Sequence, residues 1–282
     1  MTKTVFIIGA NSAVAKETIR LLRVSNTVIT GGRAHCDVYC DITQPLVIPD
    51  GVDVVVNFAA AFDESSDAAI MNIVQTNSVG MLHICMASKK AKVAHVINIS
   101  SLSAVHSKES PYYSFYALSK RNGDDLAELY CKRNELPLTI LRPSQVYGSD
   151  VAFAAHQPFL YHIIGRAEKG EDITVYGNND ALRNYLYVTD LGETVNRVIT
   201  QSFEGTYPCL YPTNVRFTEI AQVAQETFKK GGRTVFLDGK PDIPDNVFDL
   251  DVSIYEKIGY YPQVTLEQGI QKIKAYKGDS QT

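Results

Sequence analysis

The sequence predicts an α/β fold, a doubly wound parallel sheet with a smaller C-terminal lobe. Short apolar runs alternate with amphipathic segments through the first half of the chain, which is typical of parallel strands joined by crossover helices. The runs are almost uninterrupted by polar residues, as expected for strands buried on both faces of a sheet. With 282 residues, the chain is long enough for one large domain and an added lobe.

The expected strands are short runs rich in β-branched residues, at 4–8, 26–30, 52–58, 95–100 and 138–143. The expected helices carry apolar residues along one face, at 12–23, 67–90, 113–135, 157–168, 190–202, 217–230 and 264–276. The alternation becomes less regular after Gly148, and Pro and Gly cluster at 231–245. We therefore expect one domain over 1–150, rejoined by part of 173–202, and a second lobe over 151–282.

Composition and charge exclude several classes of protein. The net charge is −4 and no basic block occurs, which argues against a nucleic acid partner. The longest apolar stretch, residues 52–62, is interrupted by Asp53 and Asn57, so no membrane span is expected. The five cysteines form no CxxC pair and the histidines are dispersed, so no metal site is expected. Scattered thiols and the lack of a signal peptide predict a cytoplasmic location.

The junction between the first strand and the first helix has small residues where a phosphate-binding loop needs them. Gly9 suits a tight turn, and Ser12 and Ala15 stand where a GxxGxxG pattern would have two more glycines. Backbone N–H groups at a helix N-terminus bind phosphate when no bulky side chain blocks them. Ser12 also suits the N-cap of the helix. An ordinary strand–helix turn would look the same, so this junction alone leaves both interpretations open.

The end of the second strand favours NADP over NAD. NAD sites usually have an acidic residue there, which binds the ribose 2′-hydroxyl. Here two glycines and then Arg33 follow the strand. A guanidinium can pair with a 2′-phosphate and stack on adenine. The alternative interpretation is a solvated arginine in a loop.

Tyr116 and Lys120 are four residues apart in an expected helix, so their side chains share one face. A cation near a phenol lowers its pKa and prepares it to exchange a proton with a carbonyl or an alcohol. Ser100 and Ser101 end the preceding strand, at the edge of the sheet where ligands bind in such folds. The pattern indicates a catalytic pair, although most YxxxK matches are surface packing.

The chain carries seven motifs in order, namely the Gly9 turn, "CDIT" (40–43), "VVNFAA" (55–60), "TNSVG" (76–80), "INISS" (97–101), "YALSK" (116–120) and "LRPSQVYG" (141–148). Together these motifs resemble those of the short-chain dehydrogenase/reductase superfamily, which has a Rossmann-like fold. "LRPSQVYG" and residues 171–193 resemble its extended branch, which contains nucleotide-sugar epimerases, dehydratases and reductases. Residues 183–191 are similar to the branch pattern RxFxYVxDL, with Tyr185 in place of Phe.

The resemblance implies roles for the catalytic residues. Tyr116 would be the acid/base, and Lys120 would lower its pKa and hold the nicotinamide ribose. Asn77 would support the proton relay. A serine would hydrogen-bond the substrate oxygen; Ser101 matches best, and Ser100 and Ser103 remain alternatives.

The resemblance also implies the binding residues for cofactor and substrate. The expected substrate contacts are Ser101, Ser103, Tyr147 and Arg183, with Arg183 on the substrate diphosphate. The first lobe would be the dinucleotide-binding domain, and the second would be mainly substrate-binding. The expected cofactor contacts are Gly9, Asn11, Ser12, Ala13, Val14, Arg33, Asp41, Ile42, Phe58, Ala59, Ala60, Tyr116, Lys120, Pro143 and Val146.

Departures from the family's patterns argue against some of the reactions that its members catalyse. Dehydratases of the branch carry an Asp–Glu pair after the catalytic Ser or Thr, and here Leu102 and Ser103 follow Ser101. The epimerase–reductase that makes GDP-fucose has a cysteine after its serine, where this chain again has Leu102. His106 is the one candidate for a second acid/base, and a lone loop histidine is more often solvated.

The leading hypothesis is therefore an NAD(P)-dependent oxidoreductase. It would be an NADPH-dependent reductase of a nucleotide-activated 4-keto-6-deoxysugar. The alternatives are a nucleotide-sugar 4-epimerase with tightly bound NAD and a reductase of a non-nucleotide carbonyl. Homodimers formed through the two long helical segments are common in the family, and a homodimer is expected here on that ground.

Overall fold

The computed structural model describes residues 2–279 and divides them into two compact units. The first unit contains the residues up to Pro143 and two later segments, Gly192–Cys209 and Ser253–Gly259. The second unit contains Ser144–Leu191, Leu210–Val252 and the residues from Tyr260 on. The chain therefore leaves the first unit and returns to it twice.

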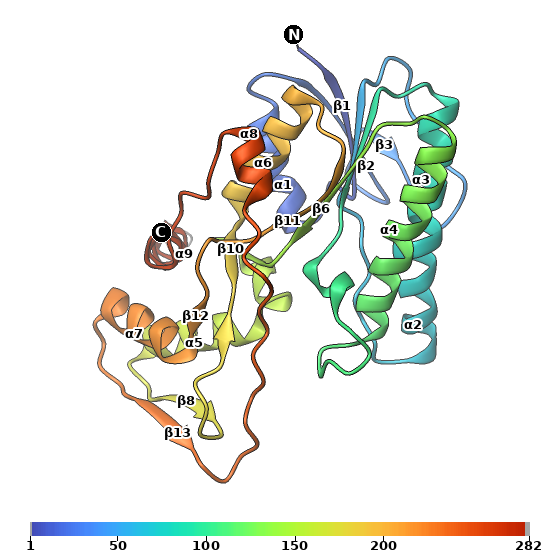
Figure 1. Cartoon of the computed structure of the whole chain (residues 1–282). Helices are drawn as coiled ribbons and strands as arrows, with labels where there is room; N and C mark the ends of the chain where they lie inside the picture. Colours follow the sequence, from blue (N-terminus) through green and yellow to red (C-terminus); the bar gives the residue numbers. More distant parts are fainter. Residues whose placement is uncertain (1, 280–282) are drawn as a thin grey trace. The chain divides into compact units, whose positions relative to one another are not determined.

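The first unit is built on a seven-stranded sheet in which every neighbouring pair is parallel (Figure 1). The strand order is β11-β6-β5-β4-β1-β2-β3, so the chain runs outward from β1 to one edge and then to the other. This order is that of a doubly wound Rossmann-like sheet, which confirms the predicted fold class. The strands are β1 (Thr4–Ile8), β2 (Thr27–Gly32), β3 (Val38–Tyr39), β4 (Val54–Asn57), β5 (His95–Ile99), β6 (Leu138–Pro143) and β11 (Gly205–Cys209).

Helices cover both faces of this sheet. The predicted helix over 67–90 consists of three consecutive parts, α2 (Asp67–Val74), a π-helical turn η1 (Gln75–Val79) and α3 (Gly80–Lys90). These parts and α4 (Phe115–Arg133) lie on one side of the sheet (Figure 1). The other helical elements of the unit are α1 (Ala13–Leu22), the 3-10 turn η2 (Leu102–Val105), most of α6 (Val188–Gln201) and α8 (Ser253–Ile258).

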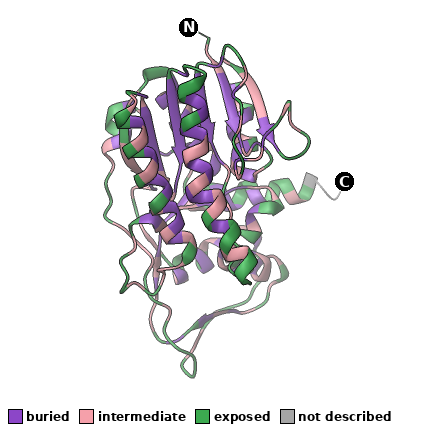
Figure 2. Ribbon diagram, turned by 90° about the vertical axis from the view of Figure 1, so that its right-hand side faces the viewer, coloured by how far each residue is buried: buried purple, intermediate pink, exposed green. Residues whose placement is uncertain are grey.

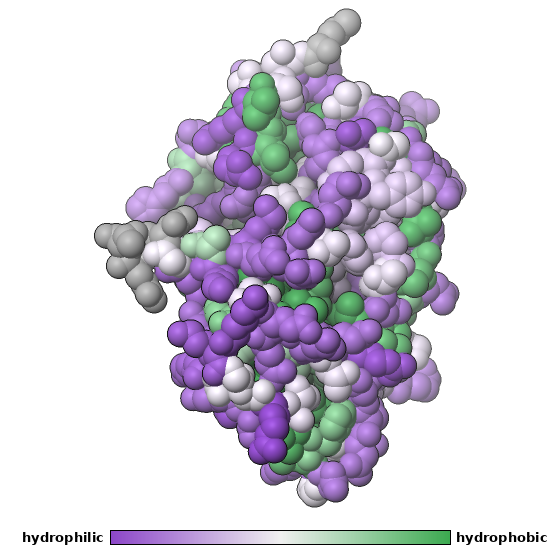
Figure 3. All heavy atoms as spheres, turned by 90° about the vertical axis from the view of Figure 1, so that its left-hand side faces the viewer, coloured by the Kyte–Doolittle hydropathy of each residue, from purple (hydrophilic) through white to green (hydrophobic). Residues whose placement is uncertain are grey.

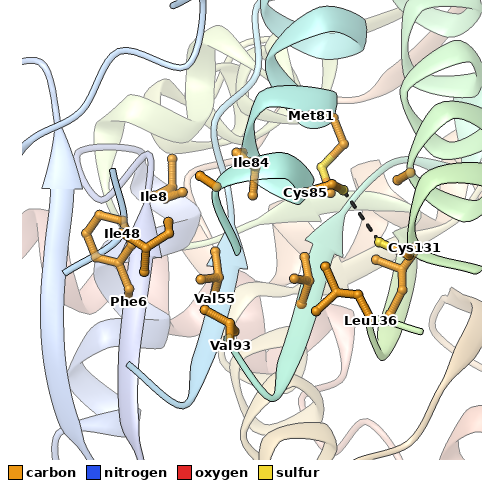
Figure 4. Close-up of a cluster of buried hydrophobic side chains, with 14 of the residues drawn as sticks. Phe6, Ile8, Ile48, Val55, Met81, Ile84, Cys85, Val93, Cys131 and Leu136 are labelled. Carbon is orange, nitrogen blue, oxygen red and sulfur yellow. Dashed lines mark hydrogen bonds between the residues drawn. The ribbon is translucent and has the colours of Figure 1, made fainter. Parts of the chain in front are cut away.

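The core of the first unit lies between the sheet and helices α3 and α4 (Figure 4). Phe6, Val55 and Ile84 are fully buried there. Burying such a side chain contributes roughly 1.5–3 kcal/mol, so this packing fixes the strand ends that carry the site. The central strands are buried along their length, while the outer surfaces of the helices are exposed (Figure 2).

The second unit contains short strand pairs and helices. Asp190 is buried and its carboxylate accepts hydrogen bonds from the Tyr260 hydroxyl (2.6 Å) and from the Gln263 and Val264 N–H groups (both 3.0 Å). These bonds fix the segment that precedes the last helix. The elements are β7 (Gln145–Tyr147) with β10 (Tyr185–Tyr187), β8 (Ile173–Tyr176) with β13 (Thr234–Leu237), β9 (Leu182–Arg183) with β12 (Val215–Arg216), η3 (Val151–Ala155), α5 (Pro158–Lys169), α7 (Phe217–Phe228) and α9 (Leu266–Asp279).

The surface carries both hydrophilic and hydrophobic residues. On the face shown in Figure 3, hydrophilic residues predominate and hydrophobic residues form separate smaller groups. Across residues 2–279, no helix combines the length and the apolar character that a membrane crossing requires.

Candidate active site

The turn between β1 and α1 brings a helix N-terminus to the carboxyl edge of the sheet. Gly9 has φ +76°, and a Cβ there would lie 2.5 Å from the backbone nitrogen of Ala59, so only glycine fits. The Ser12 hydroxyl accepts a hydrogen bond from the Ala15 N–H (3.1 Å), and Ser12 is the N-cap as predicted. The first N–H groups of a helix have no acceptor within it, so those of Ala13 and Val14 can bind an anion.

A cavity of about 390 Å³ opens beside this turn, at the ends of β1, β2 and β4. Nine of the residues predicted to contact a cofactor line it, namely Gly9, Asn11, Ser12, Arg33, Asp41, Ile42, Phe58, Ala59 and Ala60. Ala13 is buried in α1 and Val14 follows it; neither is among the residues that line the cavity. Residues not predicted from the sequence also line it, namely Ile8, Gly32, Ala34, Cys40, Thr43, Ala61, Asn72 and Thr76.

The charged residues near the end of β2 differ in their surroundings. Arg33 is exposed and lines the cavity. Asp37 lies outside the cavity lining, and its carboxylate accepts hydrogen bonds from the Thr30 N–H (2.8 Å) and hydroxyl (2.7 Å), which lower the pKa of Asp37. Asp41 accepts hydrogen bonds from the N–H (3.0 Å) and hydroxyl (2.8 Å) of Thr43. A cation thus lines the cavity at the position where NAD sites usually have an acid.

Tyr116 and Lys120 lie on successive turns of α4, on one face, as the spacing predicts. Lys120 is only 4% exposed, and its Nζ donates a hydrogen bond to the Ile99 carbonyl (2.9 Å). Burial lowers the pKa of Lys120 to about 8, and the nearby Asp124 carboxylate acts in the opposite direction. Burial raises the pKa of Tyr116, a hydrogen bond with the Ser101 side chain lowers it, and the charge of Asp124 raises it.

The three candidate serines have different partners. The buried Ser100 hydroxyl donates to the Asp124 carboxylate (2.8 Å), which occupies it within the protein. Ser101 is half-buried, accepts a hydrogen bond from the Ser103 N–H (3.1 Å) and interacts with the Tyr116 hydroxyl. Ser103 lies in the turn η2. Of the three, Ser101 has the geometry that supports a role beside Tyr116.

Asn77 lies in the π-helical turn η1 and is buried. Its side-chain Nδ2 donates to the Ala61 carbonyl (2.7 Å) and to the Ser119 hydroxyl (3.0 Å), and its Oδ1 accepts from the Ala61 N–H (2.9 Å). A Cβ on Gly123 would lie 2.2 Å from the Asn77 carbonyl oxygen, so glycine lets α4 approach the turn. Asn77 thereby connects the cavity-lining segment to the helix of Tyr116.

Four other predicted site residues are Pro143 in the first unit and Val146, Tyr147 and Arg183 in the second unit. Pro143 is buried at the end of β6, and Val146 is buried in β7 of the second unit. Tyr147 is 1% exposed and packs edge-on against the rings of Tyr185 and Tyr187, which favours a packing role over the predicted contact with substrate.

Arg183 is also buried within the second unit, with 6% of its surface exposed. Its Nη1 donates to the carbonyls of Leu182 (2.7 Å) and Pro244 (2.9 Å), and the guanidinium lies 4.6 Å from the centre of the Phe217 ring. Its contact with a substrate diphosphate stays a prediction.

Within the described part of the chain, no group of three or more His, Cys, Asp or Glu side chains is arranged to hold a metal ion. Sequence reasoning also missed Asp124 and Arg142, which form an ion pair of 2.9 Å and a network with Ser100. The spacing of Tyr116, Lys120 and Asp124 was the available signal, because all three fall on one helix face.

The chain is similar in sequence or in fold to several known proteins. Protein CapI of Staphylococcus aureus is 23% identical over 95% of this chain and 89% of that protein. The dTDP-4-dehydro-6-deoxy-D-allose reductase of Streptomyces bikiniensis is 27% identical over 56% of this chain and 48% of that protein, so the match spans about half of that relative. The solved structure of MoeE5 in complex with UDP-glucose and NAD has a TM-score of 0.79 at 18% identity, covering 99% of this chain and all of that one.

A family model also matches most of the chain. The model of the family described as NAD dependent epimerase/dehydratase matches residues 5–209, which include the cavity, Ser101, Tyr116 and Lys120. This confirms the resemblance to extended short-chain dehydrogenases/reductases and the prediction of an enzyme. The chain belongs to the NAD dependent epimerase/dehydratase family.

Proposed function

We propose that this enzyme is an NADPH-dependent reductase of a nucleotide-activated 4-keto-6-deoxysugar. The observation that carries the proposal is the grouping of Ser101, Tyr116 and Lys120 in the unit whose cavity is lined by Arg33. A proton donor with a neighbouring ammonium suits the reduction of a carbonyl. Relatives include a reductase of a dTDP-activated 4-keto-6-deoxysugar, which supports the substrate class.

The cavity fits a dinucleotide on three counts. Gly9 leaves space that any Cβ would fill, and the N-terminus of α1 offers N–H groups to a pyrophosphate. Arg33 can pair with a 2′-phosphate as a fixed cation, which favours NADPH over NADH. Solved relatives of this fold bind NAD, so the preference for NADP rests on Arg33 alone.

The bound nicotinamide would supply the hydride. Tyr116 would donate its hydroxyl proton to the oxygen that becomes the alcohol, while the Ser101 hydroxyl would hydrogen-bond that oxygen. Lys120 would stabilise the resulting phenolate by its charge. An ammonium has three N–H donors, so the bond to the Ile99 carbonyl leaves two for the ribose hydroxyls.

Two features argue against other reactions of the family. Leu102 is buried directly after Ser101, where an acid would be needed for dehydration. The nearby His106 has a pKa lowered by burial and by the charge of Arg121, and Arg121 donates to the carbonyls of Ala104 (2.7 Å) and His106 (2.5 Å). These bonds tie the His106 segment to α4, so a second acid/base for epimerisation is disfavoured.

The test is turnover with a panel of dTDP-, CDP-, GDP- and UDP-activated 4-keto-6-deoxysugars, followed by the absorbance of NADPH. We expect NADPH oxidation with at least one member and slower oxidation of NADH. Consumption of neither cofactor with any member would refute the proposal. A tightly bound dinucleotide that co-purifies and is never released would instead support the 4-epimerase, and turnover of simple ketones alone would support a non-nucleotide substrate.

A further inference from the structure

Asp124 is a buried carboxylate that the proposed reaction leaves without a role. It lies on α4 one turn after Lys120 and two turns after Tyr116, so the three side chains share one face of the helix. Asp124 has no exposed surface at all. Asp and Glu are almost never fully buried unless they are paired, so its position calls for partners.

Three side chains from the sheet supply those partners. Asn98 Nδ2 donates to one carboxylate oxygen (3.1 Å), and the Ser100 hydroxyl (2.8 Å) and Arg142 Nε (2.9 Å) donate to the other. Asn98 also accepts a hydrogen bond from Asn57 Nδ2 (3.0 Å). The carboxylate is therefore held in one position by donors from β5 and β6.

Charged side chains act on Asp124 from β6 and from its own helix. The cations that face it are Arg142 from β6 and Lys120 from its own helix, and Tyr116 is the other titratable group nearby. Burial raises the pKa of Asp124, and the Arg142 guanidinium, the Ser100 hydroxyl and Lys120 act against that rise. The Arg142 guanidinium lies 2.9 Å from the Asp124 carboxylate, and this opposite charge favours the ionised form of the carboxylate.

We propose that Asp124 is a positioning residue that acts through Lys120, because its fixed carboxylate keeps the buried amine in the ammonium form. Burial removes water from Lys120 and favours the neutral amine. The Ile99 carbonyl stabilises the ammonium form of Lys120 by accepting one hydrogen bond. The Asp124 carboxylate, one helical turn away, stabilises the ammonium further, because charges attract more strongly in a medium of low polarity. The consequence for turnover rests on the proposed function; the effect on Lys120 does not.

The direct test is NMR of protein labelled with ¹⁵N at lysine Nζ, with the Lys120 signal assigned by its loss in Lys120→Met. In the parent protein, burial lowers the pKa of Lys120 to about 8. In Asp124→Asn it should fall by about one pH unit or more, since a neighbouring opposite charge typically shifts a pKa by that amount. An unchanged titration in Asp124→Asn would overturn the proposal.

Asp125→Asn is the matched control, because Asp125 is the next residue of the same helix and is exposed. It changes the net charge of the protein equally and should leave the Lys120 titration where it was. An equal fall in both variants would assign the shift to net charge and overturn the proposal.

A measurement without mutation covers the case in which Asp124→Asn does not fold. The ¹³C carboxyl resonance of Asp124, assigned through its backbone, should show an inflection as Lys120 loses its proton near pH 8. A flat carboxyl resonance through that range would show that the two groups are not coupled and would overturn the proposal.

Turnover provides a second readout that a purely structural role would not move. Asp124→Asn should shift the alkaline limb of the kcat profile to lower pH by the same amount, with little change in KM. A wild-type enzyme that turns over none of the tested sugars would refute the proposed function, whereas the NMR titrations would still decide the role of Asp124.

Discussion

The two ends of the candidate site in the first unit are built in opposite ways. At the cofactor end, Arg33 is exposed on a loop after β2 and lines an open cavity. At the catalytic end, Lys120 and Asp124 are buried, and their hydrogen bonds connect α4 to β5 and β6. Exposed side chains can change at little cost in stability, whereas buried paired charges cannot. Cofactor preference should therefore be easy to alter, and catalysis should not.

The largest effect is expected at the catalytic end. Tyr116→Phe removes the proton donor and should lower kcat about 10²–10⁴-fold, because that is the usual contribution of a positioned acid. NADPH affinity, measured by fluorescence titration, should change little. Tyr130→Phe, on the same helix, is the control and should retain activity. A Tyr116→Phe enzyme with near-normal kcat would assign the proton to another group.

The turn at Gly9 is the rigid part of the cofactor end. Gly9→Ala puts a Cβ against the backbone of Ala59 and a side chain at positive φ, which alone costs about 1–2 kcal/mol. The melting temperature and the NADPH affinity should both fall. Gly51→Ala is a matched control, since Gly51 has the same φ of +76° with nothing within 4 Å. Equal losses in both variants would show that the close approach to Ala59 is unimportant.

Arg33→Ala tests the exposed residue at the cofactor end of the site. Losing a charged contact with a 2′-phosphate should weaken NADPH binding roughly 10-fold or more, since such hydrogen bonds contribute about 1.5–3 kcal/mol. NADH binding should change little, and the melting temperature should stay near that of the parent protein. Arg20→Ala, an exposed change on α1, is the control. Equal weakening of NADPH and NADH binding would contradict a role with the 2′-phosphate.

The pH dependence of turnover probes the buried amine. The Lys120 ammonium is present below its pKa of about 8 and is lost above it, while Tyr116, whose pKa is raised, keeps its proton. The kcat for reduction should therefore fall above about pH 8, toward a tenfold loss per pH unit. In Lys120→Arg the fall in kcat should move to higher pH, because a guanidinium stays charged. A profile that is flat to pH 10 would contradict this role of Lys120.

The smallest effect is expected at the helix cap. Ser12→Ala removes the hydrogen bond to the Ala15 N–H and should lower stability by about 1 kcal/mol, measured by urea unfolding. Ser66→Ala removes the equivalent cap of α2 at Ala69 and should cost about as much. Only Ser12→Ala should also weaken NADPH binding. Unchanged NADPH affinity in Ser12→Ala would place the pyrophosphate away from this cap.

Much of the first unit could be predicted from the sequence, because its strands are buried and apolar. The bounds of β1 and β6 match the predicted ones, at Thr4–Ile8 and Leu138–Pro143. The two-residue strand β3 and the six-residue helix α8 were missed, since so few residues carry no periodic signal. The π-helical turn η1 was also missed, because it joins α2 to α3 without a break and its residues, QTNSV, do not set it apart from an ordinary helical segment.

Some residues of the candidate site could also be predicted from the sequence, and others could not. Local motifs predicted nine cavity residues, because the turn after β1 and the ends of β2, β3 and β4 supply them. The bond from Arg142 to Asp124 and the burial of Tyr147 and Arg183 could not be predicted, because they depend on contacts with residues distant in the sequence. The homodimer, the cytoplasmic location and the assigned site roles stay predictions.

The seventh strand of the sheet has a consequence for biosynthesis. β11 pairs with β6, yet more than sixty residues of the second unit and of α6 are made between them. Until residues 205–209 leave the ribosome, the nascent sheet ends in an open edge at β6. Such an edge is a template for pairing with other chains. The length of the intervening segment therefore sets how long each new molecule is exposed to misassembly.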